Sequence, residues 1–195
     1  MQPLYDFHIK LEQYFKDDFK LSSGLVLHKD TRFDDFEGRI SFAEIIGIPK
    51  KFETPAALGD TLVFHHHINQ EPEKYEVGEG VARVSYDPLN YQGQAYAAID
   101  KETGEVKMLG NWVFLKAVSR KQEENTSASG LFLGHKTEEV KQEATVYCEG
   151  EGTEELGLNA GDLVGYSRNS DYLITLPNGD EVYRMKPDDI IYKVN

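Results

Sequence analysis

Short runs of β-branched and aromatic residues recur along the chain, and each is bounded by Gly, Asp, Asn or Pro. This pattern predicts strands over residues 7–11, 61–64, 80–84, 112–115, 162–166, 172–176 and 190–194. Asn178-Gly179 predicts a hairpin turn because both residues tolerate positive φ, and residues 100–106 are interpreted as another hairpin. Residues 42–48 are apolar at mixed spacing and residues 136–144 are polar, so neither predicts a long helix. The chain is therefore expected to be mainly β.

Two sequence elements occur twice and in the same order. SSGLVLHK at residues 22–29 is similar to ASGLFLGH at 128–135, and ALGDTLVF at 57–64 is similar to NAGDLVGY at 159–166. The paired glycines are 59 − 24 = 35 residues apart in the first half and 161 − 130 = 31 in the second. We interpret this pattern as a tandem duplication with a boundary near residues 109–112.

A polar segment precedes the second of these glycines. Residues 119–129 contain no large apolar side chain, so the sequence offers nothing there to attach the segment to a core. Three large apolar residues then follow without the alternation of a half-buried strand: Leu131, Phe132 and Leu133. Two interpretations remain open, namely a strand buried on both faces and a mobile loop that offers an apolar anchor to a partner.

Composition and charge narrow the possible functions. The 195 residues are 39% hydrophobic and 11% aromatic, enough to build cores. The formal net charge is 21 − 34 = −13, which disfavours binding to nucleic acid or to anionic lipid. The single cysteine, Cys148, allows neither an intrachain disulfide nor a cysteine-rich zinc site. The first residues lack the pattern of a signal peptide, and no apolar run reaches the ~20 residues of a membrane span, so we expect a cytoplasmic protein.

The order of these features resembles the GroES-like co-chaperonins of the chaperonin-10 family. Residues 111–195 show an opening strand, a polar loop, a glycine with three apolar residues, a strand ending in glycines, Gly161-Asp162 with a strand, and a closing PDDIIYKV. The resemblance implies two tandem GroES-like, partly open β-barrels with mobile loops and hairpin insertions. The first barrel, residues 1–110, is diverged and carries an insertion at about 65–108, and the second covers residues 111–195. The tandem form is similar to the co-chaperonins of chloroplasts.

The resemblance also implies a function and a binding site. It implies a cap on a GroEL-like chaperonin ring that assists ATP-dependent folding of unfolded proteins, with the nucleotide held by the chaperonin. A homo-oligomer is possible, and no enzyme activity and no cofactor are expected. The implied contact residues are the two apolar anchors, Leu25, Val26 and Leu27 in the first half and Leu131, Phe132 and Leu133 in the second. We expect the second anchor to dominate, since the loop before the first contains aromatic residues.

Catalytic and metal chemistry find little support in the sequence. Adjacent carboxylates such as Asp188-Asp189 face opposite ways on a strand, so they do not converge for acid–base catalysis. The two GEG segments, at residues 78–80 and 150–152, are interpreted as hairpin turns and not as phosphate-binding loops. On a strand, His65 and His67 would share a face while His66 points away, so an exposed strand end is expected rather than a metal site. Two alternatives stay open. One is a ligand- or metal-binding barrel or enzyme using residues 65–67 with Tyr86, Tyr91 and Tyr96, and the other is a diverged scaffold that no longer contacts a chaperonin.

Overall fold

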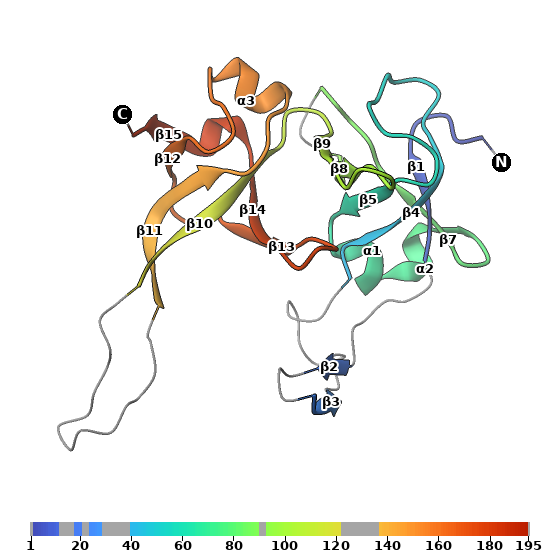
Figure 1. The fold of residues 1–195 in the computed structure, drawn as a ribbon. Helices are drawn as coiled ribbons and strands as arrows, with labels where there is room; N and C mark the ends of the chain where they lie inside the picture. Colours follow the sequence, from blue (N-terminus) through green and yellow to red (C-terminus); the bar gives the residue numbers. More distant parts are fainter. Residues whose placement is uncertain are drawn as a thin grey trace. The chain divides into compact units, whose positions relative to one another are not determined.

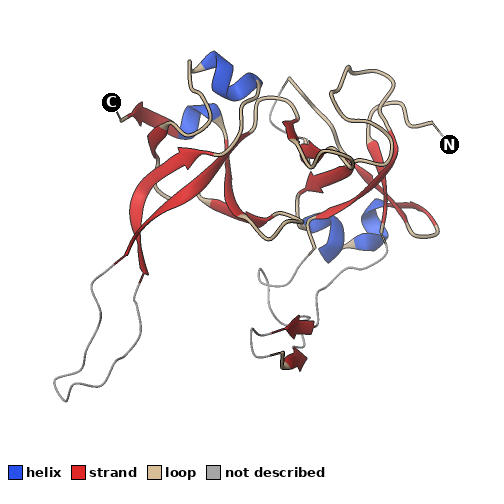
Figure 2. Ribbon diagram, in the orientation of Figure 1, coloured by secondary structure: helices blue, strands red, loops and turns tan. Residues whose placement is uncertain are grey.

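A computed structural model describes residues 2–11, 18–20, 24–28, 40–89, 93–121 and 137–194. This part of the chain is mainly β, with two larger antiparallel sheets and a separate two-stranded one (Figure 2). Neither of the two larger sheets is closed in the described residues. The predicted mainly β fold class is confirmed.

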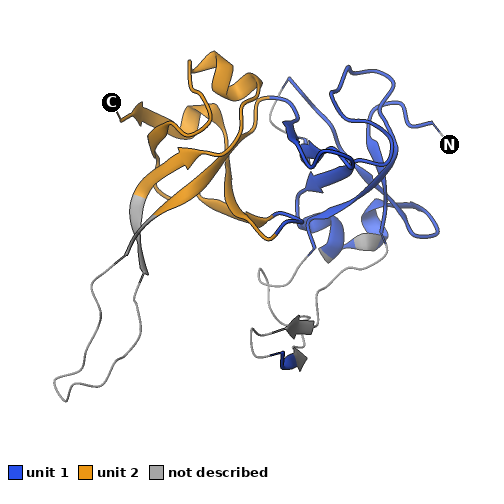
Figure 3. Ribbon diagram, in the orientation of Figure 1, with its two compact units in different colours: residues 1–110, 176–178 blue, residues 111–175, 179–195 orange. Residues whose placement is uncertain are grey.

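The chain divides into two compact units (Figure 3). Unit 1 comprises Met1–Gly110 with Leu176–Asn178, and unit 2 comprises Asn111–Thr175 with Gly179–Asn195. Each unit contains one of the larger sheets, and each is described by itself below.

The sheet of unit 1 has seven strands in the order β6-β7-β1-β4-β5-β8-β9 (Figure 1). Their bounds are β1 Phe7–Lys10, β4 Phe42–Gly47, β5 Thr61–Phe64, β6 Glu76–Gly78, β7 Val81–Val84, β8 Ala95–Ile99 and β9 Val106–Met108. Two short helices, α1 His67–Gln70 and α2 Pro72–Tyr75, follow β5. A separate two-stranded sheet, β2 Asp18–Lys20 with β3 Val26–His28, lies between β1 and β4 in sequence.

The sheet of unit 2 has six strands in the order β13-β14-β10-β11-β12-β15. Their bounds are β10 Val113–Lys121, β11 Thr137–Val146, β12 Leu163–Tyr166, β13 Tyr172–Thr175, β14 Glu181–Met185 and β15 Ile190–Lys193. Helix α3 Glu151–Glu155 follows β11, and a 3-10 turn, Pro187–Asp189, leads into β15.

The two sheets share their ladder order, because β6-β7-β1-β4-β5-β8 runs in the same sense as β13-β14-β10-β11-β12-β15. A register shift interrupts β5–β8 between Val63 and Phe64, and another interrupts β12–β15 between Gly165 and Tyr166. Directly before these shifts Val63 faces Ala97, and Gly165 faces Tyr192. In unit 1 the larger side chain of the pair, Val63, is on β5, the earlier strand in the chain. In unit 2 the larger side chain, Tyr192, is on β15, the later strand.

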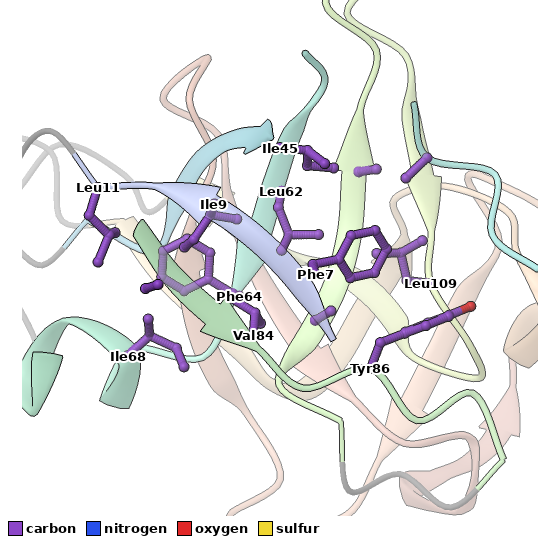
Figure 4. Packing of buried hydrophobic residues seen from close by; sticks show 14 residues of the cluster. Phe7, Ile9, Leu11, Ile45, Leu62, Phe64, Ile68, Val84, Tyr86 and Leu109 are labelled. Carbon is purple, nitrogen blue, oxygen red and sulfur yellow. The ribbon is translucent and has the colours of Figure 1, made fainter. Parts of the chain in front are cut away.

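The core of unit 1 gathers side chains from the strands and from α1 (Figure 4). Phe7 and Phe64 are fully buried, and the ring centroids of Phe7 and Tyr86 are 5.2 Å apart. Tyr86 also donates a hydrogen bond from its hydroxyl to the carbonyl of Glu53, 3.3 Å away. Tyr86 and Tyr96 are both buried, so these two tyrosines of the proposed ligand pocket belong to the packed interior, and Tyr91 lies outside the described residues.

The core of unit 2 is a separate cluster of buried side chains. It comprises Val113, Leu115, Ala144, Val146, Leu158, Val164, Tyr166, Tyr183 and Met185. The single tryptophan, Trp112, is also buried in this unit, with the guanidinium carbon of Arg184 4.5 Å from its ring centroid. Trp112 therefore reports on the folding of unit 2.

The predicted turns agree with the structure at three of four places. β8 and β9 form the hairpin around residues 100–106, Asn178-Gly179 lies between β13 and β14, and GEG at 78–80 connects β6 to β7. The fourth prediction is wrong, because Gly150-Glu151-Gly152 begins helix α3. Thr153 explains the difference: its hydroxyl bonds both the N–H and the carbonyl of Gly150 at 2.8 Å, which fixes a helix start.

Candidate functional site

The segment with the second apolar anchor connects two long paired strands. β10 and β11 continue beyond the sheet as a two-stranded ribbon in which Ser119, Arg120 and Lys121 pair with Glu139, Glu138 and Thr137 (Figure 1). The first three residues of the predicted polar loop are therefore strand residues. The rest of that loop and the anchor residues Leu131, Phe132 and Leu133 lie outside the described residues.

A large bulge separates this ribbon from the sheet. Ala117 pairs with Ala144, whereas Ser119 pairs with Glu139, so β11 contributes more residues than β10 to the interval between the two pairs. Gln142 lies in this interval with a φ of 64°, a conformation that side-chain-bearing residues rarely adopt. Bulges bend the strand that carries them, so this one changes the direction of the ribbon relative to the sheet. This bulge could not be predicted from the sequence, because residues 136–144 are too polar to resemble a strand.

The first apolar anchor lies on the small β2–β3 hairpin. Lys20 pairs with Val26, and Phe19 pairs with Leu27. Leu25 and Val26 are 57% and 43% exposed, so two of the three predicted contact residues present apolar surface in the described part of the chain. For Leu27 the structure describes the backbone position only. The hairpin occupies the connection between β1 and β4, as the second anchor occupies the connection between β10 and β11.

Each unit also contains the same aspartate turn ahead of a central strand. Asp60 accepts a hydrogen bond from the N–H of Ala57, and Asp162 accepts one from the N–H of Asn159, both at 2.8 Å. Each turn includes a glycine with left-handed φ, 87° at Gly59 and 88° at Gly161. A side chain in that conformation is strained, which explains the repeated Gly-Asp of the sequence.

Charge interactions differ between the two turns. Lys193 of β15 donates to Asp162 over 2.6 Å. The hydrogen bond from Asn159 and then that from Lys193 hold the pKa of Asp162 below its usual value. Asp60 is buried and accepts a further, longer bond of 3.4 Å from the N–H of Lys101. In both units the carboxylate thus holds a turn and has no geometry suited to acid–base catalysis.

Unit 2 also holds a second polar cluster. Lys116 donates to one carboxylate oxygen of Asp180 at 2.7 Å, and the hydroxyl of Tyr147 donates to the other at 2.9 Å. The hydrogen bond to Asp180 raises the pKa of Lys116. These groups join β10, the residue after β11 and the β13–β14 turn, so the cluster ties these three parts of unit 2 together.

The thiol of Cys148 is half-buried, and burial raises its pKa to about 12. It is therefore protonated at neutral pH and a poor nucleophile. Asp188 and Asp189 form the 3-10 turn before β15, where Asp189 accepts a bond from the N–H of Lys186 at 3.3 Å.

The histidine run differs from its predicted conformation. β5 ends at Phe64, His66 is helical and His67 begins α1. The three ring centroids lie 4.3 to 4.5 Å apart. The sequence predicted an exposed strand end with His66 turned away from His65 and His67. That prediction is wrong, because the backbone after Phe64 turns into α1.

Comparison with known proteins supports the resemblance. The family described as Chaperonin 10 Kd subunit matches residues 105–194. Co-chaperonin GroES of Clostridium botulinum (strain Alaska E43 / Type E3) is 37% identical over 92 residues, which cover 44% of this chain and 94% of that protein. The chain belongs to the chaperonin 10 kDa subunit family.

Membership supports a co-chaperonin role. The matched residues include all strands of unit 2, from β10 to β15, together with β9. The ribbon, the Gly161-Asp162 turn and the closing strand β15 are thus part of the region that matches this family. In the described part of the chain, no helix has the length and apolar character needed to cross a bilayer.

Proposed function

We propose that this chain is a co-chaperonin that caps a GroEL-like chaperonin ring and assists ATP-dependent folding of client proteins without catalysis of its own. The contacts are made by two apolar anchors, Leu131, Phe132 and Leu133 after the ribbon and Leu25, Val26 and Leu27 on the β2–β3 hairpin. The second anchor dominates. The family match over unit 2 carries the proposal, because it includes the whole segment from β10 to β11.

The ribbon supports this role in unit 2. Its backbone pairs Ser119–Glu139 and Lys121–Thr137 lie beyond the bulge at Gln142. Leu131, Phe132 and Leu133 follow the first strand of this ribbon in the sequence, after a polar stretch without large apolar side chains. An apolar run in such a sequence context is typical of a docking segment.

The energetics favour many weak contacts over a single strong one. Burying three large apolar side chains yields roughly 4–9 kcal/mol. Ordering about eight loop residues costs on the order of 8–16 kcal/mol. A single anchor therefore binds weakly, and useful affinity comes from several anchors on one assembly, each raising the effective concentration of the next. Weak individual contacts also permit release in each nucleotide cycle.

Unit 1 is a diverged second copy of the same fold in this proposal, with the first barrel at residues 1–110 and the second at 111–195. Three observations support it. The ladder order is shared, the register shifts fall at Val63/Phe64 and Gly165/Tyr166, and the aspartate turns have the same hydrogen bonds. The exposure of Leu25 and Val26 supports the proposal that this copy retains a docking segment.

Association of several copies fits the edge of unit 2. Within the described residues β15 pairs only with β12, and its side chains Ile191 and Tyr192 are 65% and 49% exposed. An open, apolar edge strand is suited to strand addition. We therefore include a homo-oligomer in the proposal.

Capture by a bacterial GroEL-type chaperonin, with and without ATP, tests the function. The full chain is expected to bind only with nucleotide, and Leu131→Ala with Leu133→Ala is expected to abolish binding. Leu25→Ala is expected to weaken it less. Leu156→Ala and Leu173→Ala are matched controls, because both side chains are exposed in unit 2 (40% and 52%) and neither belongs to an anchor.

Two results with the anchor variants would overturn the assignment of the anchors. One is nucleotide-dependent binding that the anchor variants leave unchanged. The other is an anchor variant that unfolds unit 2, monitored by Trp112 fluorescence, while binding per folded molecule stays constant. In that case residues 131–133 form a core strand. Failure of the wild-type chain to bind contradicts the co-chaperonin role itself.

A further inference from the structure

The histidine run of unit 1 is held by a rigid turn. The N–H of His65 donates to the carbonyl of Gln94 at 2.9 Å, next to β8. The N–H groups of Ile68 and Asn69 donate to the carbonyls of His65 and His66 at 3.1 and 3.0 Å. This backbone therefore has a fixed path from the end of β5 into α1.

Buried side chains on both sides fix the turn further. Phe64, just before the histidines, and Ile68, just after them, are fully buried and belong to the unit 1 core (Figure 4). Asn69 is 2% exposed, and its side-chain amide donates to the carbonyl of Ile40. The three imidazoles thus project from a segment that cannot move without disturbing the core.

The imidazole nitrogens converge in this turn. One ligand nitrogen from each of His65, His66 and His67 lies within 4.8 Å of the other two. Nitrogens that share a tetrahedral Zn²⁺ at about 2.0–2.1 Å are roughly 3.4 Å apart. Small rotations of the three imidazoles would bring their nitrogens to that separation, because the backbone of residues 65–67 is already held by the turn. His65 Nδ1 accepts a 3.2 Å hydrogen bond from the N–H of His67, and this long bond is the contact a metal at that nitrogen would replace.

We propose that His65, His66 and His67 form a binding site for a divalent transition metal, with Zn²⁺ as the expected ion. Three neutral imidazoles suit zinc and its neighbours in the periodic table, whereas Mg²⁺ and Ca²⁺ prefer oxygen ligands. Within the described residues, the cluster contains no carboxylate or thiol. The nearby Glu71 is paired with Lys74 at 2.7 Å. The remaining coordination position is therefore left for water or for a group from a partner.

This site is independent of chaperonin docking. It lies where β5 meets α1, and neither anchor contributes to it. A bound ion ties the end of β5 to the first residue of α1, so it stabilises unit 1 in proportion to its binding. The proposal reverses the expectation from the sequence, which rested on strand geometry that the turn does not have.

Zinc titration of the untagged full chain by calorimetry, with metal analysis after dialysis, tests the site. The expected stoichiometry is one Zn²⁺ per chain. His67→Asn is expected to reduce affinity by more than about tenfold, since even outer-shell partners of a metal site are worth that much. His65→Asn combined with His67→Asn is expected to abolish binding. His135→Asn, in the other half of the sequence, is the matched control and is expected to bind as the wild type does.

A second measurement does not depend on any variant folding correctly. Zn²⁺ is expected to protect residues 65–67 of the wild-type chain from chemical modification of imidazole, read by mass spectrometry of the peptides. Mg²⁺ at the same concentration is expected to give no protection. Absence of stoichiometric zinc, equal protection by both ions, or unchanged affinity in the double variant would overturn the proposal. None of these results bears on chaperonin binding.

Discussion

Replacement of Gly165 by valine is expected to destabilise unit 2 through a single contact. A Cβ added at Gly165 would lie 2.1 Å from Cζ of Tyr192, its partner on β15. The backbone of Gly165 is outside the left-handed region, so the substitution strains no dihedral angle. The expected loss of stability comes from the Tyr192 ring, which must move away from the surface over Gly165 that it covers. Overpacking of this kind costs about 1–3 kcal/mol.

Removing the ring should reverse that cost. Tyr192 is 49% exposed, so Tyr192→Ala alone loses about 1 kcal/mol, roughly half the value for a fully buried aromatic side chain. Together the changes reproduce the pair Val63–Ala97, which unit 1 has at the same place in its ladder. The double variant is expected to lie within about 1 kcal/mol of the wild type, with a coupling energy of about 1–3 kcal/mol.

Urea unfolding followed by Trp112 fluorescence measures this cycle, because the only tryptophan of the chain is buried in unit 2. The three variants are compared with the wild type at constant m-value. Additive free energies in the double variant would refute the reasoning, because they would show that the valine and the ring never compete for the same space.

Three further outcomes are expected. Asp162 has a lowered pKa when folded, so it stabilises unit 2 above about pH 4 and the contribution is lost as the pH falls through the folded pKa. Asp162→Asn should therefore flatten the acid limb of stability measured by fluorescence, and an unchanged limb contradicts the assignment. Gln142→Gly should raise the stability of unit 2 by up to about 1 kcal/mol by relieving the positive φ, whereas Glu143→Gly, one residue on, should lower it. Cys148 should resist alkylation at about pH 8 in the native chain and react on denaturation, since burial raises its pKa to about 12; rapid native labelling would exclude this.

The sequence predicted the strands that combine high β propensity with clear boundaries. β1, β5, β7, β12, β13 and β15 all lie within the predicted ranges. β8 was not predicted, because Ala95, Ala97 and Ala98 have low β propensity and four of its five residues are buried, which removes the alternation of a half-buried strand. The first half of β11 is polar and is a strand only through its pairing with β10.

The candidate site was predicted by residue type more than by geometry. The two anchors followed from consecutive apolar residues after a glycine, and Leu25 and Val26 are indeed exposed. The chaperonin contacts of both anchors, residues 25–27 and 131–133, stay a prediction. The convergence of His65, His66 and His67 depends on where β5 ends, and a helix of only four residues leaves no periodicity from which that end could be located.

The pairs Val63–Ala97 and Gly165–Tyr192 place the larger side chain on opposite strands of the ladder, and this difference affects how the chain avoids misfolding. Two sheets with one ladder order in a single polypeptide can swap strands during folding, a known failure of repeated domains. β5 paired with β15 would bring Val63 against Tyr192, and β12 paired with β8 would place Gly165 opposite Ala97, leaving a hole. One swapped sheet is destabilised by overpacking and the other by a cavity, whereas both native sheets remain well packed. This single position in the ladder therefore favours pairing of strands within the same unit over pairing between units.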